Sequence, residues 1–258
     1  MLVLLLVEDI PRRKGLMRLL CPNTPPAPVQ YFTKLGSTEC VVIKAKRLRG
    51  AITWDVIGRA VGNHPIIMPK EVTAPTFINR HSSHGFLAQV LFNTAEKIIL
   101  SSKTSAKARR VSVLDLKGEW CQQVVKLTKL AGTVRVHTEN PRVYEKYGDM
   151  CYKEQGVQII VTSEAMSQYN FDFALCPNGD TWGPDPAIMI KNCHNRFCLV
   201  PRSVWVSGIS SVVPKGICHS DVISALYEYE GHKRLGHITA DFLVHNGYKV
   251  FADDLMGK

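Results

Sequence analysis

The chain has 258 residues, of which 45% are hydrophobic, 8% aromatic and 21% charged. This length predicts one or two domains with a sizeable core, and this composition excludes the disordered and fibrous classes of protein. No apolar run approaches the roughly 20 residues that cross a bilayer. The opening MLVLLLVED also lacks a basic leading segment and a cleavage site, so we expect a cytoplasmic protein without a membrane span or signal peptide.

The first hundred residues predict an α+β segment. Apolar runs predict strands at 2–7, 40–45 and 66–68, and the prolines of 21–30 forbid a regular helix. A capped helix is predicted from Thr53 to Gly62, and helically spaced apolar residues predict a second helix over 85–100. The polar stretch 101–110 predicts a linker, so the predicted domains are residues 1–105 and 106–258.

Residues 109–180 form the clearest part of the second domain, because strand and helix patterns alternate there. Strands are predicted at 111–114, 133–138, 157–161 and 171–175, and helices at 119–130, 141–155 and 164–169. This alternation is typical of βαβ units, whose right-handed crossovers make the strands parallel. The C-terminal extension predicts strands at 197–200 and 204–206 and a helix at 221–229. The predicted fold class is therefore α/β, a Rossmann-like parallel sheet with an additional N-terminal α+β segment.

Ligands of open parallel sheets bind at the carboxyl ends of the strands. The predicted ligand-binding residues in those loops are Asp115, Lys117, Gly118, Thr138, Glu139, Thr162, Asn178 and Gly179. Gly118 lies at a predicted helix N-terminus, whose N–H groups favour phosphate, and Lys117 adds a cation. Capping by Thr138 or Asn140 before Pro141 is the simpler interpretation of the second loop.

The segment VSVLDLKGEW occupies the place of a dinucleotide-binding turn, and Glu139 follows Gly118 by 21 residues. Here the chain resembles Rossmann-fold dinucleotide-binding domains. It also resembles an uncharacterised group of bacterial Rossmann-like proteins, which implies a fold and no activity. The first resemblance implies that Glu139 accepts ribose hydroxyls. The turn is degenerate, however, because Asp115, Lys117 and Trp120 stand where the three glycines belong, and conventional NAD(P) binding is therefore disfavoured.

The net charge of +10 is concentrated in the first half of the chain. Residues 1–130 hold 20 Lys/Arg against 8 Asp/Glu, whereas residues 131–258 hold 12 against 14. A basic surface attracts anions, so residues 1–130 are candidates for contact with an anionic ligand or partner. An ordinary solvated surface is the alternative, because only 44–50 and 103–110 form basic clusters.

The cysteines and histidines give no metal-binding pattern. Cys193, His194, Cys198 and Cys218 supply ligand types that zinc accepts, but no CxxC occurs, so we expect no metal and eight reduced thiols. His81 and His84 precede a predicted helix, where capping and solvent contact are expected.

Three functional hypotheses follow. The first is a protein that binds a nucleotide or phosphorylated small molecule at the carboxyl ends of its strands. The second is a non-catalytic binding module for nucleic acid or an acidic partner, and the third is an NAD(P)-dependent oxidoreductase. The sequence leaves open whether the protein is an enzyme, and a nucleophilic role for Asp115 is disfavoured because DLKG lacks a second aspartate two positions on.

Overall fold

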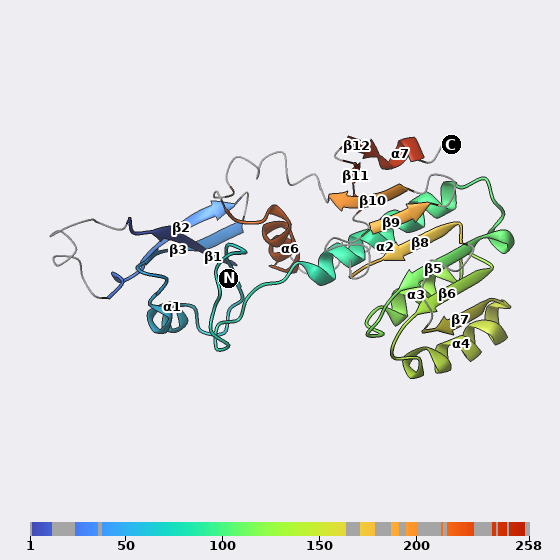
Figure 1. Ribbon diagram of the computed structural model, residues 1–258, viewed down its shortest axis with the longest axis horizontal. Helices are drawn as coiled ribbons and strands as arrows, with labels where there is room; N and C mark the ends of the chain where they lie inside the picture. Colours follow the sequence, from blue (N-terminus) through green and yellow to red (C-terminus); the bar gives the residue numbers. More distant parts are fainter. Residues whose placement is uncertain are drawn as a thin grey trace. The chain divides into compact units, whose positions relative to one another are not determined.

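A computed structural model describes residues 2–11, 24–35, 38–163, 171–178, 187–190, 195–200, 213, 216–229, 239–240, 242–246 and 248–255. Only the backbone is described at 190, 195–200, 242, 245 and 251–253. Contacts divide the chain into two compact units, one containing Met1–Ser83 and Val204–His232 and the other His84–Ser203 and Lys233–Lys258 (Figure 1). The domain boundary predicted between residues 105 and 106 stays a prediction.

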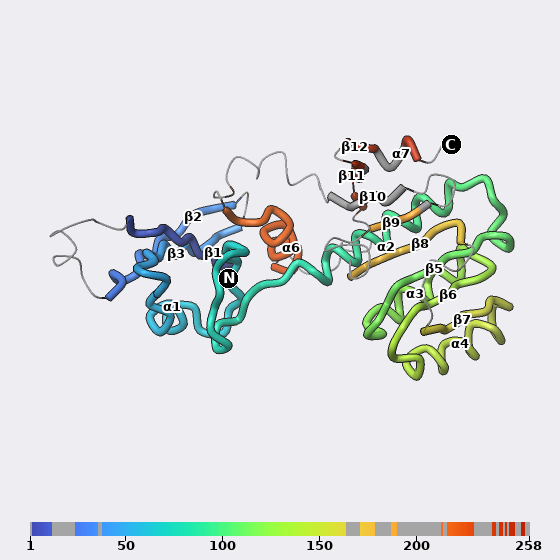
Figure 2. Tube along the Cα trace, viewed as in Figure 1, coloured from blue at the N-terminus to red at the C-terminus, as the bar shows by residue number. Residues whose placement is uncertain are grey.

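The first unit is a four-stranded sheet with a helix on each face. Its elements are β1 (Leu2–Asp9), β2 (Val29–Leu35), β3 (Thr38–Arg47), α1 (Trp54–Val61), β4 (Ile66–Ile67) and α6 (His219–Tyr229). The strand order is β2-β3-β1-β4, in which β1 runs parallel to β3 and β4, and β2 runs antiparallel to β3. Figure 2 shows α6, in orange, beside the blue strands of this sheet, although α6 begins at His219 and the last of the long strands ends at Arg47.

The continuous apolar run of β1 follows from this burial on both faces. Leu2 and Leu4 pack in one cluster with residues of α6, such as Val222. Val3 and Leu5 point to the opposite face and pack in a second cluster that includes Ile57 of α1. Alternating residues of one strand thus serve two separate cores.

The second unit contains an eight-stranded mixed sheet. Its elements are α2 (His84–Ser101), η2 (Ala106–Ala108), β5 (Arg110–Leu114), α3 (Cys121–Leu127), β6 (Thr133–His137), α4 (Arg142–Gln155), β7 (Gln158–Thr162), β8 (Phe173–Cys176), β9 (Ala187–Ile190), β10 (Asn195–Val200), β11 (Phe242–His245), β12 (Tyr248–Phe251) and α7 (Ala252–Leu255). The strand order is β12-β11-β10-β9-β8-β5-β6-β7. β5 pairs in parallel with β6 and β8, and β6 pairs in parallel with β7.

The prediction of four parallel strands between residues 111 and 175 is confirmed by this pairing. The glycine stop predicted after the 141–155 helix is also confirmed, because Gly156 adopts a left-handed conformation with φ of +66° and its N–H bonds to the carbonyl of Tyr152. The sheet as a whole is mixed rather than parallel, since β9 to β12 continue from β8 with antiparallel pairing. The fold class that the structure supports is mixed α/β.

The first unit also contains parallel pairing, and β2 was not predicted from its sequence. The helix predicted at 164–169 and the strand predicted at 204–206 lie outside the described residues. Of the helices in the described part, none has the length and apolar character that spanning a membrane requires.

Candidate functional site

The topology of the second unit singles out the carboxyl ends of β5 and β8. From β5 the chain moves through β6 to β7 on one side, and then returns to place β8 on the other side of β5. Ligands of open α/β sheets bind where the strand order reverses in this way, since neighbouring loops there diverge. The loops concerned are 115–120 after β5 and 177–178 after β8.

Asp115 organises the loop after β5. Its side chain is fully buried and accepts hydrogen bonds from the backbone N–H groups of Gly118 (3.1 Å), Glu119 (3.0 Å) and Trp120 (2.9 Å). The hydroxyl of Tyr144, on α4, donates a further hydrogen bond to the same carboxylate. Asp115 therefore accepts hydrogen bonds from the backbone amides of the turn that leads into α3, which begins at Cys121.

This arrangement bears directly on the predicted phosphate-binding turn. The N–H groups of the turn already donate to a carboxylate, so they are not bare donors for an anion. The carboxylate also places a negative charge at the helix N-terminus, where it is stabilised by the helix dipole.

Two neighbouring groups stay protonated at neutral pH. Burial, followed by the hydrogen bond to Asp115, raises the pKa of Tyr144 well above its ordinary value. Burial and then the charge of Asp115 raise the pKa of Cys121 to about 11. Cys121 is accordingly a buried thiol and not an activated nucleophile.

Gly118 has a structural reason to be glycine. Its φ is +78°, and a Cβ at this position would lie 3.2 Å from Cγ2 of Val143. The remaining glycine of the degenerate turn thus permits a left-handed backbone and a close approach of the segment after β6.

The loop after β6 is tied to the loop after β5. The hydroxyl of Thr138 donates to the carbonyl of Leu116 (3.1 Å), and the N–H of Glu139 donates to the same carbonyl (2.9 Å). Thr138 is buried, and its N–H bonds to the carbonyl of Thr162. The carboxylate of Glu139 is exposed on this fixed backbone.

Asn178 joins the ends of β8 and β5 through its side-chain amide. Its Oδ1 accepts a hydrogen bond from Nε1 of Trp120 (2.7 Å) and lies 3.0 Å from Nε2 of His84, the first residue of α2. Its Nδ2 lies 3.5 Å from the carboxylate of Glu119. A carboxylate, an amide and an imidazole therefore meet at the point where the strand order reverses.

Trp120 stands where the third glycine of the dinucleotide-binding pattern belongs, but its side chain lies beside the turn instead of obstructing it. Its side chain is buried, with ring centroids 6.1 Å from Phe92 and 6.0 Å from His84. The indole thus packs against α2 beside the loop. Sequence reasoning missed Glu119 and His84 as members of this group, because only the tertiary structure brings residues 84, 119 and 178 together.

The predicted site residues thus fall into two groups. Asp115, Gly118, Thr138 and Glu139 belong to the linked loops after β5 and β6, to which Thr162 adds its carbonyl. Lys117 is exposed, and its own carbonyl lies 3.5 Å from the side-chain amide of Asn140. Asn178 belongs to the group with His84, and Gly179 lies outside the described residues.

A pocket of about 400 Å³ lies at the amino ends of β5, β6 and β7, the ends opposite to the loops described above. It is lined by residues that include Lys107, Thr128, Lys129 and Gln155, near the C-terminal ends of α3 and α4. Helix C-termini carry partial negative charge that lysines complement. The lysines are thus explained without an anionic ligand.

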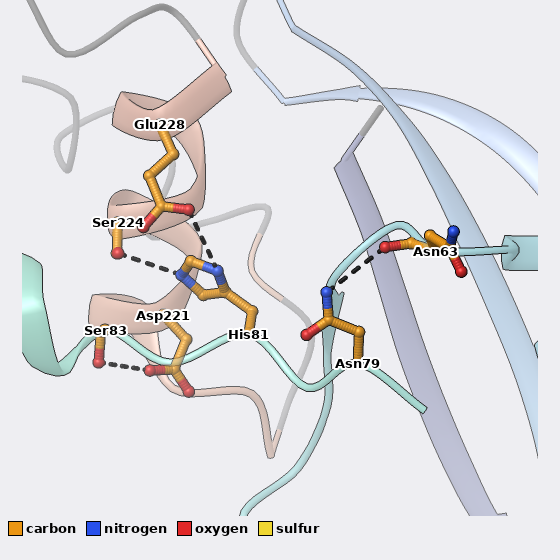
Figure 3. Close-up of polar contacts among 7 residues, drawn as sticks. All are labelled: Asn63, Asn79, His81, Ser83, Asp221, Ser224 and Glu228. Carbon is orange, nitrogen blue, oxygen red and sulfur yellow. Dashed lines mark hydrogen bonds and ion pairs between the residues drawn. The ribbon is translucent and has the colours of Figure 1, made fainter. Parts of the chain in front are cut away.

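A third polar group lies in the first unit, shown in Figure 3. Nε2 of His81 is 3.1 Å from Oγ of Ser224, and its Nδ1 is 3.6 Å from the carboxylate of Glu228, one turn further along α6. Ser83 donates a 2.6 Å hydrogen bond to Asp221 of the same helix. A serine, a histidine and an acid in contact are the components of a hydrolytic triad.

The burial of Ser224 argues for a structural role instead. Its side chain has no exposed surface, and it lies among buried apolar residues of α6, so no substrate carbonyl reaches its hydroxyl in this structure. The two hydrogen-bonded pairs fasten α6 to the segment that follows β4. The sequence predicted that His81 caps a helix or contacts solvent. The structure instead buries His81 in contact with Ser224.

Metal ligands do not gather in the described residues, where no group of three or more His, Cys, Asp or Glu side chains has the arrangement that a metal ion needs. Cys193 and His194 lie outside the described residues, and the side chain of Cys198 is not described. Cys40, Cys121, Cys151, Cys176 and Cys218 are not in disulfide bonds.

Comparison with known proteins adds no relative. No family model, no curated protein and no solved structure matches this chain significantly. Function is therefore inferred from the chemistry of the site itself.

Proposed function

We propose that the second unit is a Rossmann-like unit that binds a small molecule containing a nucleoside. The nucleoside lies at the carboxyl ends of β5, β6 and β8, with its ribose on Glu139 and with no phosphate on the turn after β5. The proposal concerns binding, and it assigns no reaction to the protein.

The hydrogen bonds of Asp115 are the observation that carries the proposal. Conventional dinucleotide binding needs bare backbone at this turn, so that the pyrophosphate can approach the helix N-terminus. Here the buried carboxylate of Asp115 already takes three N–H groups. A phosphate at hydrogen-bond distance from the same amides would be repelled by that carboxylate, because like charges interact strongly away from water.

Glu139 supplies the complementary feature. Its backbone is fixed at the end of β6 by the hydrogen bond to Leu116, and its carboxylate is exposed. An acidic residue following the second strand of such a unit accepts the hydroxyls of a ribose. The part of the ligand near the turn is then neutral or cationic, whereas the ribose provides the hydrogen-bond donors.

The hydrogen bonds of Asp115 bear on the three functional hypotheses that the sequence left open. An NAD(P)-dependent oxidoreductase would need another way to hold a pyrophosphate. A phosphorylated small molecule remains compatible only if its phosphate reaches the exposed ammonium of Lys117 instead of the turn amides. The hypothesis of a nucleic-acid or acidic-partner module rests on charge alone.

Calorimetric titration with five probes tests the proposal. Adenosine and S-adenosylmethionine are expected to bind, whereas NAD and inorganic phosphate are expected not to bind at about 1 mM, where a Kd of 1 mM corresponds to only about −4 kcal/mol. Removing the ribose hydroxyls, with 2′,3′-dideoxyadenosine as the probe, is expected to weaken binding at least about tenfold, equivalent to about 1.4 kcal/mol.

The variant Glu139→Gln is expected to show the same loss with adenosine. Glu145→Gln is the matched control, because Glu145 is an exposed glutamate in the first turn of α4. Absence of binding by both adenosine and S-adenosylmethionine would refute the proposal. Tight binding of NAD or of inorganic phosphate would also refute it, because the carboxylate of Asp115 is expected to prevent such binding.

A further inference from the structure

The carboxyl edge of the second sheet continues past the turn after β5 to the end of β8. Figure 1 shows β8, β5 and β6 side by side, and both outer strands pair in parallel with β5. Dinucleotides carry their pyrophosphate on the 5′ carbon of the ribose and place it at the turn after the first strand, while the ribose lies after the second strand. A nucleoside whose ribose lies on Glu139, after β6, therefore directs its 5′ substituent toward the loops of Glu119 and Asn178.

The hydrogen bonds of Asn178 fix which way its side-chain amide points. The indole of Trp120 only donates hydrogen bonds, so the amide atom that lies 2.7 Å from its Nε1 is the oxygen Oδ1. Nε2 of His84, at 3.0 Å from the same oxygen, then carries a hydrogen. The amide NH₂ group faces the carboxylate of Glu119, whose oxygen lies 3.5 Å from Nδ2. Asn178 thus positions this carboxylate without neutralising its charge.

The charges at this edge are mostly negative. Three carboxylates and one ammonium lie in the loops that contain residues 115–120, 138–140 and 177–178. The carboxylate of Asp115 is fully buried, those of Glu119 and Glu139 are exposed, and the ammonium belongs to Lys117. The chain as a whole has a net charge of +10, so its general surface does not explain a negative edge. Such a local field attracts cations and repels anions.

We propose that the ligand carries a positive charge on its 5′ substituent, as a sulfonium or an ammonium group, and that Glu119 selects this charge; the proposal rests on the nucleoside binding proposed above. Asp115 is fully buried, and its oxygens already accept hydrogen bonds from the turn. Glu119 is exposed, and its carboxylate is held by the amide of Asn178. A cation at this position is attracted by both carboxylates, a phosphate is repelled by both, and a hydroxyl gains no charge interaction.

Calorimetric titration of the full chain with matched nucleosides tests the proposal. The amine of 5′-amino-5′-deoxyadenosine is protonated at neutral pH, and this nucleoside is expected to bind at least about tenfold more tightly than adenosine, equivalent to about 1.4 kcal/mol. The dimethylsulfonium derivative of 5′-deoxyadenosine is expected to exceed the neutral methylthio derivative by a similar factor. Adenosine 5′-monophosphate is expected to bind more weakly than adenosine.

The variant Glu119→Gln identifies the residue that selects the charge. The measured quantity is the ratio of the affinities for the amine and for adenosine, because a general disturbance of the site weakens both alike. We expect this ratio to fall to about 2 or less, since the attracting charge has been removed. Glu145→Gln is the matched control, because Glu145 is an exposed glutamate on α4, and it is expected to keep the ratio of the natural chain. Raising the salt concentration from about 0.05 to about 0.5 M is expected to lower the ratio in the natural chain, because exposed charges are screened.

The outcomes separate this inference from the proposed function. Absence of binding by adenosine and by both cationic nucleosides would refute the two together. Binding of adenosine without a gain from either cation would overturn the selection of charge and leave nucleoside binding intact. A gain that Glu119→Gln preserves, or tighter binding of the monophosphate than of adenosine, would overturn it in the same way.

Discussion

Replacing Asp115 with alanine tests the account of the turn after β5 most directly. The change removes the acceptor of three backbone N–H groups and of the Tyr144 hydroxyl. The N–H of Trp120 and the hydroxyl of Tyr144 are buried, so they have no access to water as a replacement. The other two N–H groups are partly buried and are solvated more easily.

The expected loss of stability follows from the two buried donors. Each unsatisfied buried donor costs about 1–3 kcal/mol, so Asp115→Ala is expected to lower the free energy of unfolding by about 4 kcal/mol. Asp115→Asn keeps one acceptor oxygen but introduces an NH₂ group among donors, and we expect about half of that loss. Tyr144→Phe removes only one donor and is expected to cost about 1 kcal/mol.

Urea denaturation followed by circular dichroism gives the free energies, and hydrogen exchange locates the effect. Exchange is expected to accelerate at the amides of Gly118, Glu119 and Trp120 in Asp115→Ala. Asp149→Ala is the control, because Asp149 is an exposed aspartate on α4 whose removal is expected to change stability by less than about 0.5 kcal/mol. A loss below about 1 kcal/mol for Asp115→Ala, with the three amides still protected, would show that Asp115 does not hold the turn.

Three further outcomes are expected. Gly132→Ala places a Cβ 2.1 Å from the carbonyl oxygen of Lys107 and is expected to cost about 3 kcal/mol in urea denaturation; a neutral result would show that this contact relaxes freely. Gly148→Ala, in the interior of α4 with open space around the added Cβ, is expected to stabilise by up to about 1 kcal/mol, and a loss would contradict the helix assignment. The pKa of Cys121 is raised to about 11 from 9.0, so its contribution to stability is complete below pH 9 and is lost as the pH rises towards 11. Urea midpoints measured across that range are expected to fall less for Cys121→Ala than for the natural chain, and equal slopes would refute this.

The central part of the fold was predictable from sequence because its elements are locally encoded. Apolar runs at 111–114 and 133–137 alternate with helical spacing, and Gly156 ends a helix through its own left-handed conformation. Such signals depend on residues only a few positions apart. The antiparallel strands after β8 and the edge strand β2 carry weaker local signals, and their pairing depends on partners elsewhere in the chain.

In the candidate site, too, some features are encoded locally and others depend on contacts between distant residues. The sequence placed Asp115, Glu139 and Asn178 in loops after predicted strands, and the topology puts those loops at the carboxyl ends of the sheet. It also predicted that Asp115 would be unfavourable to a phosphate. It did not predict how, because the three amides and the Tyr144 hydroxyl converge on the carboxylate only after β5, α3 and α4 have packed.

By itself the sequence determined the alternation of strands and helices over residues 109–163 and the strand that follows at 173–176, since hydrophobic periodicity and glycine stops act within single elements. Only the tertiary structure decided which strands pair, because strand pairing is a contact between segments that are distant in the chain. It alone also turned the amides of the turn inward to Asp115. It likewise brought His81 to Ser224 across 143 residues, since a buried polar group must find its partner wherever the packed core provides one.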